Sequence, residues 1–428
     1  MNEFEVVALL LAVAIALATL ADSVKVPYPI LLVVGGLVLS LQPWAPHYTL
    51  PPEVVFLAFL PPLLYAAAYN TNWARFRQQI RPISLLAIGL VFFTTSAVAW
   101  AAHEFVGLGW GPAFVLGAIV SPPDAVAAMA ITRRVRVPAV VSTLLEGESL
   151  VNDASALVAY RIAVAAVVTG VFSMADATVQ FAVVSVGGVA VGLAGAWLVM
   201  RLHTWLNRKK LADSKTTIAI TLLTPYVLYL PAERLHVSGV LAVVTAGLIV
   251  GANRRRLFPD GLRVEARAVW ETVDFVLNVL IFILIGFQLP AILDGLSADY
   301  SPKVLAIDAA IVSGVVIVTR FLWVYPGAYL PRFLDRVLGL STDAYPPWRQ
   351  VAVVAWTGMR GVVSLAGALA LPTVLADGTA FPSRDLIQFL TFWVIFATLV
   401  LQGLTLPLLI RLLGVNRQAE PPGEPPSC

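Results

Sequence analysis

The sequence predicts an all-α polytopic membrane protein with about 13 transmembrane helices. Hydrophobic residues make up 59% of the 428 positions and charged residues only 12%, whereas soluble domains carry about 25% charged residues. The missing charge is replaced by apolar runs of about 20 residues, the length with which a helix crosses a bilayer. The basic residues also gather in alternate loops, as they do when the two sides of a membrane differ.

Apolar runs separated by breakers give thirteen candidate spans. The first run follows the acidic start Met-Asn-Glu-Phe-Glu, which is unlike the basic start of a signal peptide, so we expect it to be a retained span. Residues 1–413 are predicted to form one transmembrane domain, and the Pro-rich segment 414–428 a disordered cytoplasmic tail. The spans are predicted at 4–21, 27–42, 51–69, 82–106, 112–131, 138–169, 178–201, 214–231, 236–252, 265–289, 303–328, 348–371 and 385–412.

The distribution of positive charge predicts the orientation. One set of alternate loops holds 22 of the 28 Lys and Arg residues, whereas the opposite set holds only Arg234, Lys303 and Arg384. The positive-inside rule therefore predicts a multi-pass protein of the cell inner (plasma) membrane with its N-terminus outside and its C-terminus in the cytoplasm. Because the basic residues follow this rule, they do not indicate nucleic acid as a partner; membrane lipid is expected instead.

Several function classes lack their motifs. The chain has one cysteine, Cys428, which excludes an intramolecular disulfide or a cysteine metal cluster. Neither the phosphate-binding pattern GxxxxGK[ST] of an ATP-driven pump nor the zinc-protease pattern HExxH occurs. The sequence thus predicts that the protein is not an enzyme and uses no cofactor.

The fifth span contains an acidic residue beside two helix breakers. Asp124 lies about 18 Å along this span, near the bilayer midplane. Pro122 and Pro123 cannot continue a helix, and unwound backbone at such depth is tolerated only where it lines a cavity or is covered by protein. A simple proline kink with Asp124 as a helix cap is the structural alternative.

The sixth span carries a polar strip two residues wide. Ser149 and Asp153 share one helix face, and Glu148 and Asn152 form the adjacent stripe. A serine or an asparagine could hold helices together, but an aspartate near the middle of the bilayer points to function.

Other ionisable residues also fall inside spans. Arg360, flanked by glycines near the middle of the twelfth span, is expected to need an acidic partner, whereas Arg320 could instead extend to the cytoplasmic surface. We expect Glu271, Asp274 and Asp308 to lie near the membrane surfaces and Glu146 at the edge of a cytoplasmic funnel. Arg161 is expected to reach the outer surface or to form a local pair.

The two broken spans, five and twelve, lie seven helices apart and so cross the membrane in opposite directions. This is the mark of inverted-topology repeats whose discontinuous helices cross near the midplane. We expect spans 1–6 and 8–13 to be the repeats, linked by span 7.

Taken together, these motifs resemble the monovalent cation/proton antiporter family that includes bacterial and animal sodium/proton exchangers. The resemblance covers nearly the whole chain, and the Gly-Glu-Ser to Asn-Asp motif is its specific part. The matching stretches are Leu60-Pro61-Pro62-Leu63-Leu64, Ser121 to Val126, Gly147 to Ala154, Ser238 to Val243, Trp270-Glu271 with Ile285 to Leu289, and Gly358-Met359-Arg360-Gly361.

The resemblance implies a dimer of thirteen-span subunits and assigns roles to the polar residues. Asp153 would carry the cation or the proton, with Ser149 as a second metal ligand and Asn152 as neighbour. Asp124 and the backbone near Pro123 would complete the site. Glu148 would pair with either Arg360 or Arg320. The Asn-Asp order is associated in the family with electroneutral exchange.

This sequence departs from the family pattern at two places. Tyr65-Ala66-Ala67 stands where many relatives carry an acidic residue, and Pro123 stands where a threonine is frequent. The expected function is exchange of a monovalent cation, foremost Na+, for H+. The alternatives are K+/H+ or Li+-accepting exchange, a pH-gated cation channel and, more remotely, an aspartyl dyad of Asp124 and Asp153.

Overall fold

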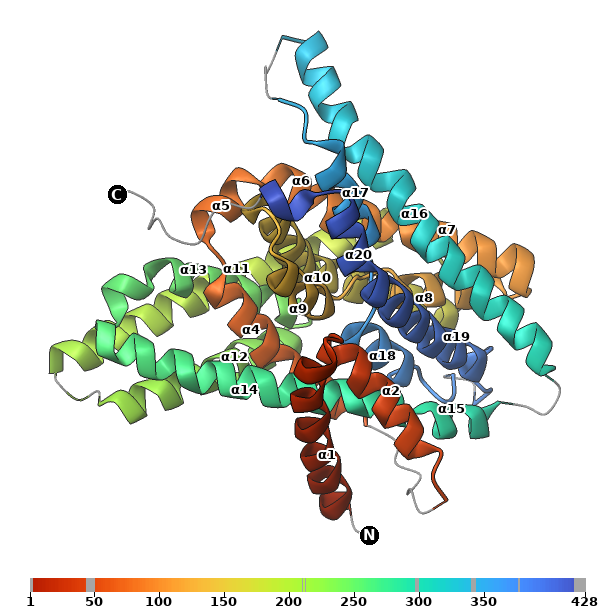
Figure 1. The fold of residues 1–428 in the computed structure, drawn as a ribbon, viewed down its shortest axis with the longest axis horizontal. Helices are drawn as coiled ribbons and strands as arrows, with labels where there is room; N and C mark the ends of the chain where they lie inside the picture. The colour runs from red at the N-terminus through yellow and green to blue at the C-terminus, as the bar shows by residue number, and fades with distance from the viewer. Residues whose placement is uncertain are drawn as a thin grey trace.

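The computed structural model is a bundle of helices (Figure 1). It describes residues 3–43, 51–209, 211, 213–296, 300–339, 344–375 and 378–418. Within these ranges the β-structure amounts to one isolated bridge between Val374 and Ala380. The predicted all-α fold is confirmed.

Every predicted span coincides with one helix or with a series of two to four consecutive helical segments. The first six correspond to α1 (Glu3–Val24), α2 (Tyr28–Ser40), α3–η1–α4 (Pro52–Val54, Val55–Phe59, Leu60–Asn70), α6–η2–α7–η3 (Ile80–Ser84, Leu85–Leu90, Val91–Ala101, Ala102–Val106), α8–α9 (Trp110–Val120, Ala125–Val135) and α10 (Ala139–Thr169). The others are α11 (Met174–Lys209), α12 (Ser214–Arg234), α13 (Gly239–Leu257), α14 (Asp260–Phe287), α16 (Pro302–Val337), α17–α18 (Trp348–Trp356, Val362–Leu369) and α19–η4–α20 (Arg384–Ala397, Thr398–Gln402, Gly403–Leu412). The short α5 (Trp73–Gln78) and α15 (Leu289–Gly295) join neighbouring spans.

Eight helical stretches of the described chain are long and apolar enough to cross a membrane, and α2 and part of α1 are shorter apolar helices. The end of the chain requires one correction. Residues 415–418 form the 3-10 helix η5 (Val415–Gln418), and Val415 is fully buried. The packed part therefore extends past the predicted boundary at 414, while 419–428 lies outside the described residues.

The helices surround a centre formed by two interrupted helices. In Figure 1, α11, α12 and α13 lie on one side of the molecule, α7, α16 and α19 on the other, and α10 runs between them. The chain unwinds between α8 and α9 and again between α17 and α18. The two breaks meet, because the backbone N–H of Asp124 donates to the carbonyl of Met359 at 2.6 Å. The predicted crossing of spans five and twelve is thus confirmed.

Close helix packing places these elements. A Cβ on Gly36 of α2 would overlap with the carbonyl oxygen of Ile283 in α14, and a Cβ on Gly286 of α14 would overlap with that of Val33 in α2. The two helix backbones are therefore in direct contact at two reciprocal points. Glycine permits this approach, a common device where helices associate in membranes.

Candidate functional site

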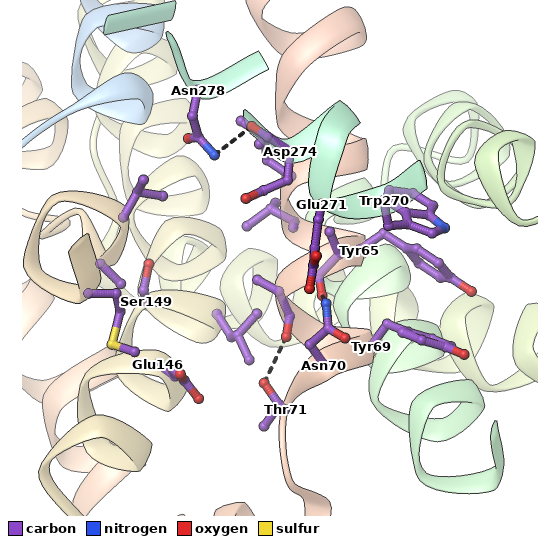
Figure 2. Close-up of a pocket in the computed structure, with 18 of the residues that line it drawn as sticks. Tyr65, Tyr69, Asn70, Thr71, Glu146, Ser149, Trp270, Glu271, Asp274 and Asn278 are labelled. Atoms are coloured by element: carbon purple, nitrogen blue, oxygen red, sulfur yellow. Dashed lines mark hydrogen bonds between the residues drawn. The ribbon is translucent and has the colours of Figure 1, made fainter. Parts of the chain in front are cut away.

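A cavity of about 1060 Å³ opens between α4, α9, α10, α13 and α14 and reaches the crossing of the broken helices. Its lining includes four of the residues predicted to form the ion site: Pro123, Asp124, Ser149 and Asp153. Figure 2 shows the polar side chains of α10 on one wall and those of α4 and α14 on the other.

Asp124 begins the second half of the broken helix. Its Oδ1 accepts a hydrogen bond from the backbone N–H of Val126 at 2.8 Å, the geometry of a helix N-cap. Its Oδ2 has no partner among the described residues and lies against Gly361, where a Cβ would overlap with it. Asp124 therefore caps the second half-helix, as the structural alternative predicted, and the helix is also unwound before it. The two interpretations of this segment are both correct.

The two polar stripes of α10 point in different directions. Ser149 and Asp153 line the cavity, whereas Glu148 and Asn152 are buried away from it. Asn152 Nδ2 donates to the carbonyl of Pro123 at 3.1 Å, which ties the break to α10. Asp153 makes no hydrogen bond or ion pair with another described residue. One carboxylate thus faces the cavity unpaired, beside carbonyls and hydroxyls that could share a cation with it.

Glu148 pairs with Arg320 and not with Arg360. Arg320 Nη1 and Nη2 donate to the two carboxylate oxygens of Glu148 at 2.6 and 2.8 Å, and Nε donates to the carbonyl of Val354 at 3.1 Å. Both side chains are buried, with 2% and 0% exposed. The alternative in which Arg320 extends to the membrane surface is wrong, because bidentate pairing satisfies the guanidinium inside the bundle.

Arg360 has no carboxylate partner among the described residues, so the expectation of an acidic partner is also wrong. Its Nε donates to the carbonyl of Val120 at 2.6 Å and its Nη1 to that of Gly358 at 2.5 Å. Val120 is the last residue of α8, where the helix leaves carbonyls unpaired and carries partial negative charge. Arg360 therefore supplies the hydrogen bonds and the positive charge that the end of the broken helix lacks.

The other charged residues divide into two groups. Arg161 pairs with Glu233 at 2.6 Å, which confirms the expected local pair, and Asp308 is buried in α16. Glu146, expected at the edge of a cytoplasmic funnel, lines the cavity, and so do Glu271 and Asp274, for which positions near the membrane surface are predicted. So does Asn278, one turn above Asp274, which sequence reasoning missed. The spacing of Glu271, Asp274 and Asn278 on one helix face was the signal that could have found them.

Comparison with known proteins shows what the chain is similar to. The family described as sodium/hydrogen exchanger, transmembrane, matches residues 8–412. A sodium, potassium, lithium and rubidium/H(+) antiporter of Bacillus subtilis is 36% identical over 393 residues, covering 90% of this chain and 58% of the relative. The Na(+)/H(+) antiporter NhaS2 of Synechocystis is 33% identical over 411 residues, covering 96% of this chain and 70% of that protein.

The same fold occurs in a solved structure. The sodium proton antiporter MjNhaP1 from Methanocaldococcus jannaschii superposes with a TM-score of 0.71 at 20% identity, covering 95% of this chain and 98% of that one. The chain spans about three fifths of the length of the Bacillus relatives that it matches, at 58% and 61%. The match over residues 8–412 nevertheless includes every helix of the site, and this chain belongs to the transmembrane family of sodium/hydrogen exchangers.

Proposed function

We propose that the protein is a secondary active antiporter that exchanges a monovalent cation, foremost Na+, for H+, and not an enzyme. The observation that carries the proposal is Asp153, an unpaired carboxylate that faces a cavity at the crossing of two broken helices. The membership in the exchanger family supports it. No cofactor is required, because the transported ions supply the driving force.

The exchange follows from competition for one carboxylate. Asp153 can hold a proton or a cation but not both, and either neutralises its charge. With neither bound, the charge would have to cross the low-dielectric interior, which costs several kcal/mol or more. Movement of the site between the two sides of the membrane is therefore restricted to its loaded forms, and each cycle trades one ion for the other.

The charges around the site favour one-for-one exchange. Arg320 balances the charge of Glu148, whereas Asp153 lines the cavity without an ion-pair partner among the described residues. Asn152 is neutral and its amide is used to hold Pro123. With a single exchangeable charge, each proton or cation bound restores neutrality, and we propose that the exchange is electroneutral.

The sodium ligands that we propose are Asp153 and Ser149, completed by water and by carbonyls of the break near Pro123. These are oxygen donors, which suit a hard monovalent cation. The name of the Bacillus subtilis relative includes potassium, lithium and rubidium, so K+/H+ exchange and acceptance of Li+ are alternatives at the same site. Flux assays with Na+, K+ and Li+ in turn separate them.

We further propose a homodimer in the inner membrane, with the N-terminus outside and spans 1–6 and 8–13 as inverted repeats. The charge bias of the loops supports the orientation. The opposite directions of the two crossing broken helices support the repeats. The dimer rests on the family resemblance, and cross-linking in native membranes tests it.

The substitution Asp153→Asn tests the function directly. In proteoliposomes with an outward Na+ gradient, we expect the wild type to acidify the lumen, because each Na+ that leaves is exchanged for an entering H+, and the Asp153→Asn variant to show no exchange. The reason is that an amide is neutral without an ion and cannot release a proton. Normal exchange by this variant would refute the assignment.

A matched control is Asp308→Asn, which makes the same change in a buried carboxylate that does not line the cavity. We expect it to retain exchange. The channel alternative predicts a different signature: cation flux that follows the membrane potential and produces no opposing proton flux. Clamping the potential with valinomycin and K+ separates the two mechanisms.

A further inference from the structure

Two ladders of polar side chains face each other across the cavity. Glu146, Ser149 and Asp153 follow one another on α10, and Glu271, Asp274 and Asn278 on α14. Both sets are spaced i, i+3, i+7, so each lies along one face of its helix. All six residues line the cavity, and Figure 2 draws Glu146 and Ser149 opposite Glu271, Asp274 and Asn278. The proposed exchange site uses Ser149 and Asp153 of the first ladder and no residue of the second.

Asn278, in the second ladder, has a buried polar atom whose hydrogen-bonding capacity the surrounding residues leave unsatisfied. Its side chain is 1% exposed, and its Oδ1 has no hydrogen-bond partner among the described residues. Its Nδ2 donates to the carbonyl of Asp274 at 2.8 Å, which fixes the orientation of the amide (Figure 2). A buried carbonyl oxygen without a partner costs about 1–3 kcal/mol. An oxygen held in this way is a ligand position ready for a cation.

The charge along α14 changes sign on the way into the cavity. At the start of the helix the cavity is lined by Asp260, which pairs with Arg263, and by Arg267, followed by Glu271, Asp274 and then Asn278. At 1.5 Å per residue, about 16 Å separates Arg267 from Asn278. A cation that enters past Arg267 then meets two carboxylates before it reaches Asp153. The acidic layer is where an entering cation would be held.

We propose that the two ladders form a second site for a monovalent cation, between the mouth of the cavity and Asp153. Asn278 Oδ1 is its fixed ligand, and Glu271 and Asp274 supply the charge that holds a partly hydrated ion opposite Ser149. The site rests on the proposed antiport function and deepens it. It binds the entering cation before Asp153 does and passes it on, and so it sets the apparent affinity and not the maximal rate.

Transport kinetics give the first test. For Asn278→Ala we expect the apparent KM for Na+ to rise about fivefold, because one oxygen contact worth about 1 kcal/mol is lost, with the maximal rate retained. Glu271→Gln and Asp274→Asn are expected to raise KM in the same direction. The matched control is Glu265→Gln on the same helix, an exposed carboxylate that does not line the cavity; its KM should stay unchanged.

The KM of the Asn278→Ala variant distinguishes a cation site with specific ligands from a general electrostatic attraction of cations to the acidic residues. Asn278→Ala removes an oxygen without changing charge, so a field effect alone leaves its KM unchanged while Glu271→Gln and Asp274→Asn raise theirs. That pattern would overturn the proposal. So would a loss of maximal rate at unchanged KM in Asn278→Ala, because Asn278 would then support the fold or the exchange step instead.

Binding of 22Na+ to purified protein tests the site apart from the exchange reaction. We expect the Asp153→Asn variant to retain saturable, low-affinity 22Na+ binding in a scintillation proximity assay, and the double variant Asp153→Asn/Asn278→Ala to lose it. Absence of saturable binding in Asp153→Asn, or equal binding in both variants, refutes the second site. Persistent exchange in Asp153→Asn would instead refute the function of Asp153, so the two failures are distinguishable.

Discussion

Among single residues, Arg320 and Arg360 show that two buried arginines of one site can have different roles. Arg320 compensates a carboxylate, whereas Arg360 binds the carbonyls at the end of α8 and beside it. Gly358 makes room for both, since a Cβ there would lie 2.7 Å from Arg320 Cδ and 3.4 Å from Arg360 Nη1. These two positive charges inside the bundle are therefore each held in place by specific partners.

The ion pair of Glu148 and Arg320 gives a prediction on stability. Glu148→Gln leaves the buried guanidinium without its counter-charge, and we expect a loss of about 3–5 kcal/mol in the free energy of unfolding. The measurement is thermal unfolding of the purified protein in detergent. Replacing both residues together, as in Glu148→Leu/Arg320→Leu, is expected to restore much of the loss, because no lone charge is left buried. A double variant less stable than Glu148→Gln would contradict this account.

Gly361 gives a prediction on the site. Gly361→Ala places a methyl group where Asp124 Oδ2 lies, so the carboxylate must move and the junction of the two breaks must open. We expect a loss of exchange of about tenfold or more, since overpacking costs about 1–3 kcal/mol at the position proposed to complete the ion site. The control is Gly314→Ala in α16, where a Cβ would meet nothing within 4 Å. Equal activity of the two variants would argue against the role given to Asp124.

At the scale of the elements, glycine contacts determine how α2 and α14 meet. α14 carries the residues Glu271, Asp274 and Asn278 of the cavity wall, and its outer half packs on α2 through Gly36 and Gly286. The two backbones are in direct contact there, so the position of the whole helix depends on the absence of a Cβ at Gly36 and Gly286. A change at this contact is transmitted along α14 to the cavity.

We expect Gly36→Ala and Gly286→Ala each to lower the stability by about 1–3 kcal/mol, because the two helices must separate to admit a methyl group. The double variant should lose less than the sum of the two, since one separation relieves both overlaps. Thermal unfolding in detergent measures all three, with Gly314→Ala as the neutral reference. Strict additivity would show that the two contacts act independently.

For the molecule as a whole, the cavity gives the direction in which the site opens. Its lining includes Arg254, Arg255, Arg263 and Arg267 at the adjoining ends of α13 and α14, and these belong to the basic set that the positive-inside rule places in the cytoplasm. On the other side, the pair Arg161–Glu233 joins α10 to α12, and Glu233 also accepts from the backbone N–H of Gly239 at 3.1 Å. The structure is therefore open on the side with the basic loops.

Cysteine labelling tests this direction. Because Cys428 is the only native cysteine, Cys428→Ser gives a background without thiols. In it, Ser149→Cys is expected to react with a membrane-impermeant cationic thiol reagent in inside-out vesicles and not in right-side-out vesicles. Val171→Cys, in the exposed loop after α10, should show the reverse. Labelling of both positions from the same side would contradict the proposed orientation of the cavity.

The sequence alone predicted the helices, the two breaks and the unusual charges, because the bilayer imposes local rules. A span needs a certain length, and an unwound segment needs helix breakers such as Pro122 and Pro123. A carboxylate inside a span, such as Asp153, costs free energy and therefore indicates function. The stripes of α10 also followed from spacing alone. These features are determined within about twenty residues of chain, where helix geometry is sufficient.

The tertiary structure alone decided which side chains meet. Glu148 and Arg320 are 172 residues apart, and Arg360 and Val120 are 240 residues apart; no local pattern selects these partners over others. The same holds for Asn278, because only the packing of α14 opposite α10 leaves its buried Oδ1 without a partner in the cavity wall. Local constraints thus determined the elements and the candidate residues, whereas the packing of distant helices, through contacts as small as Gly36 and Gly286, decided the site that they form.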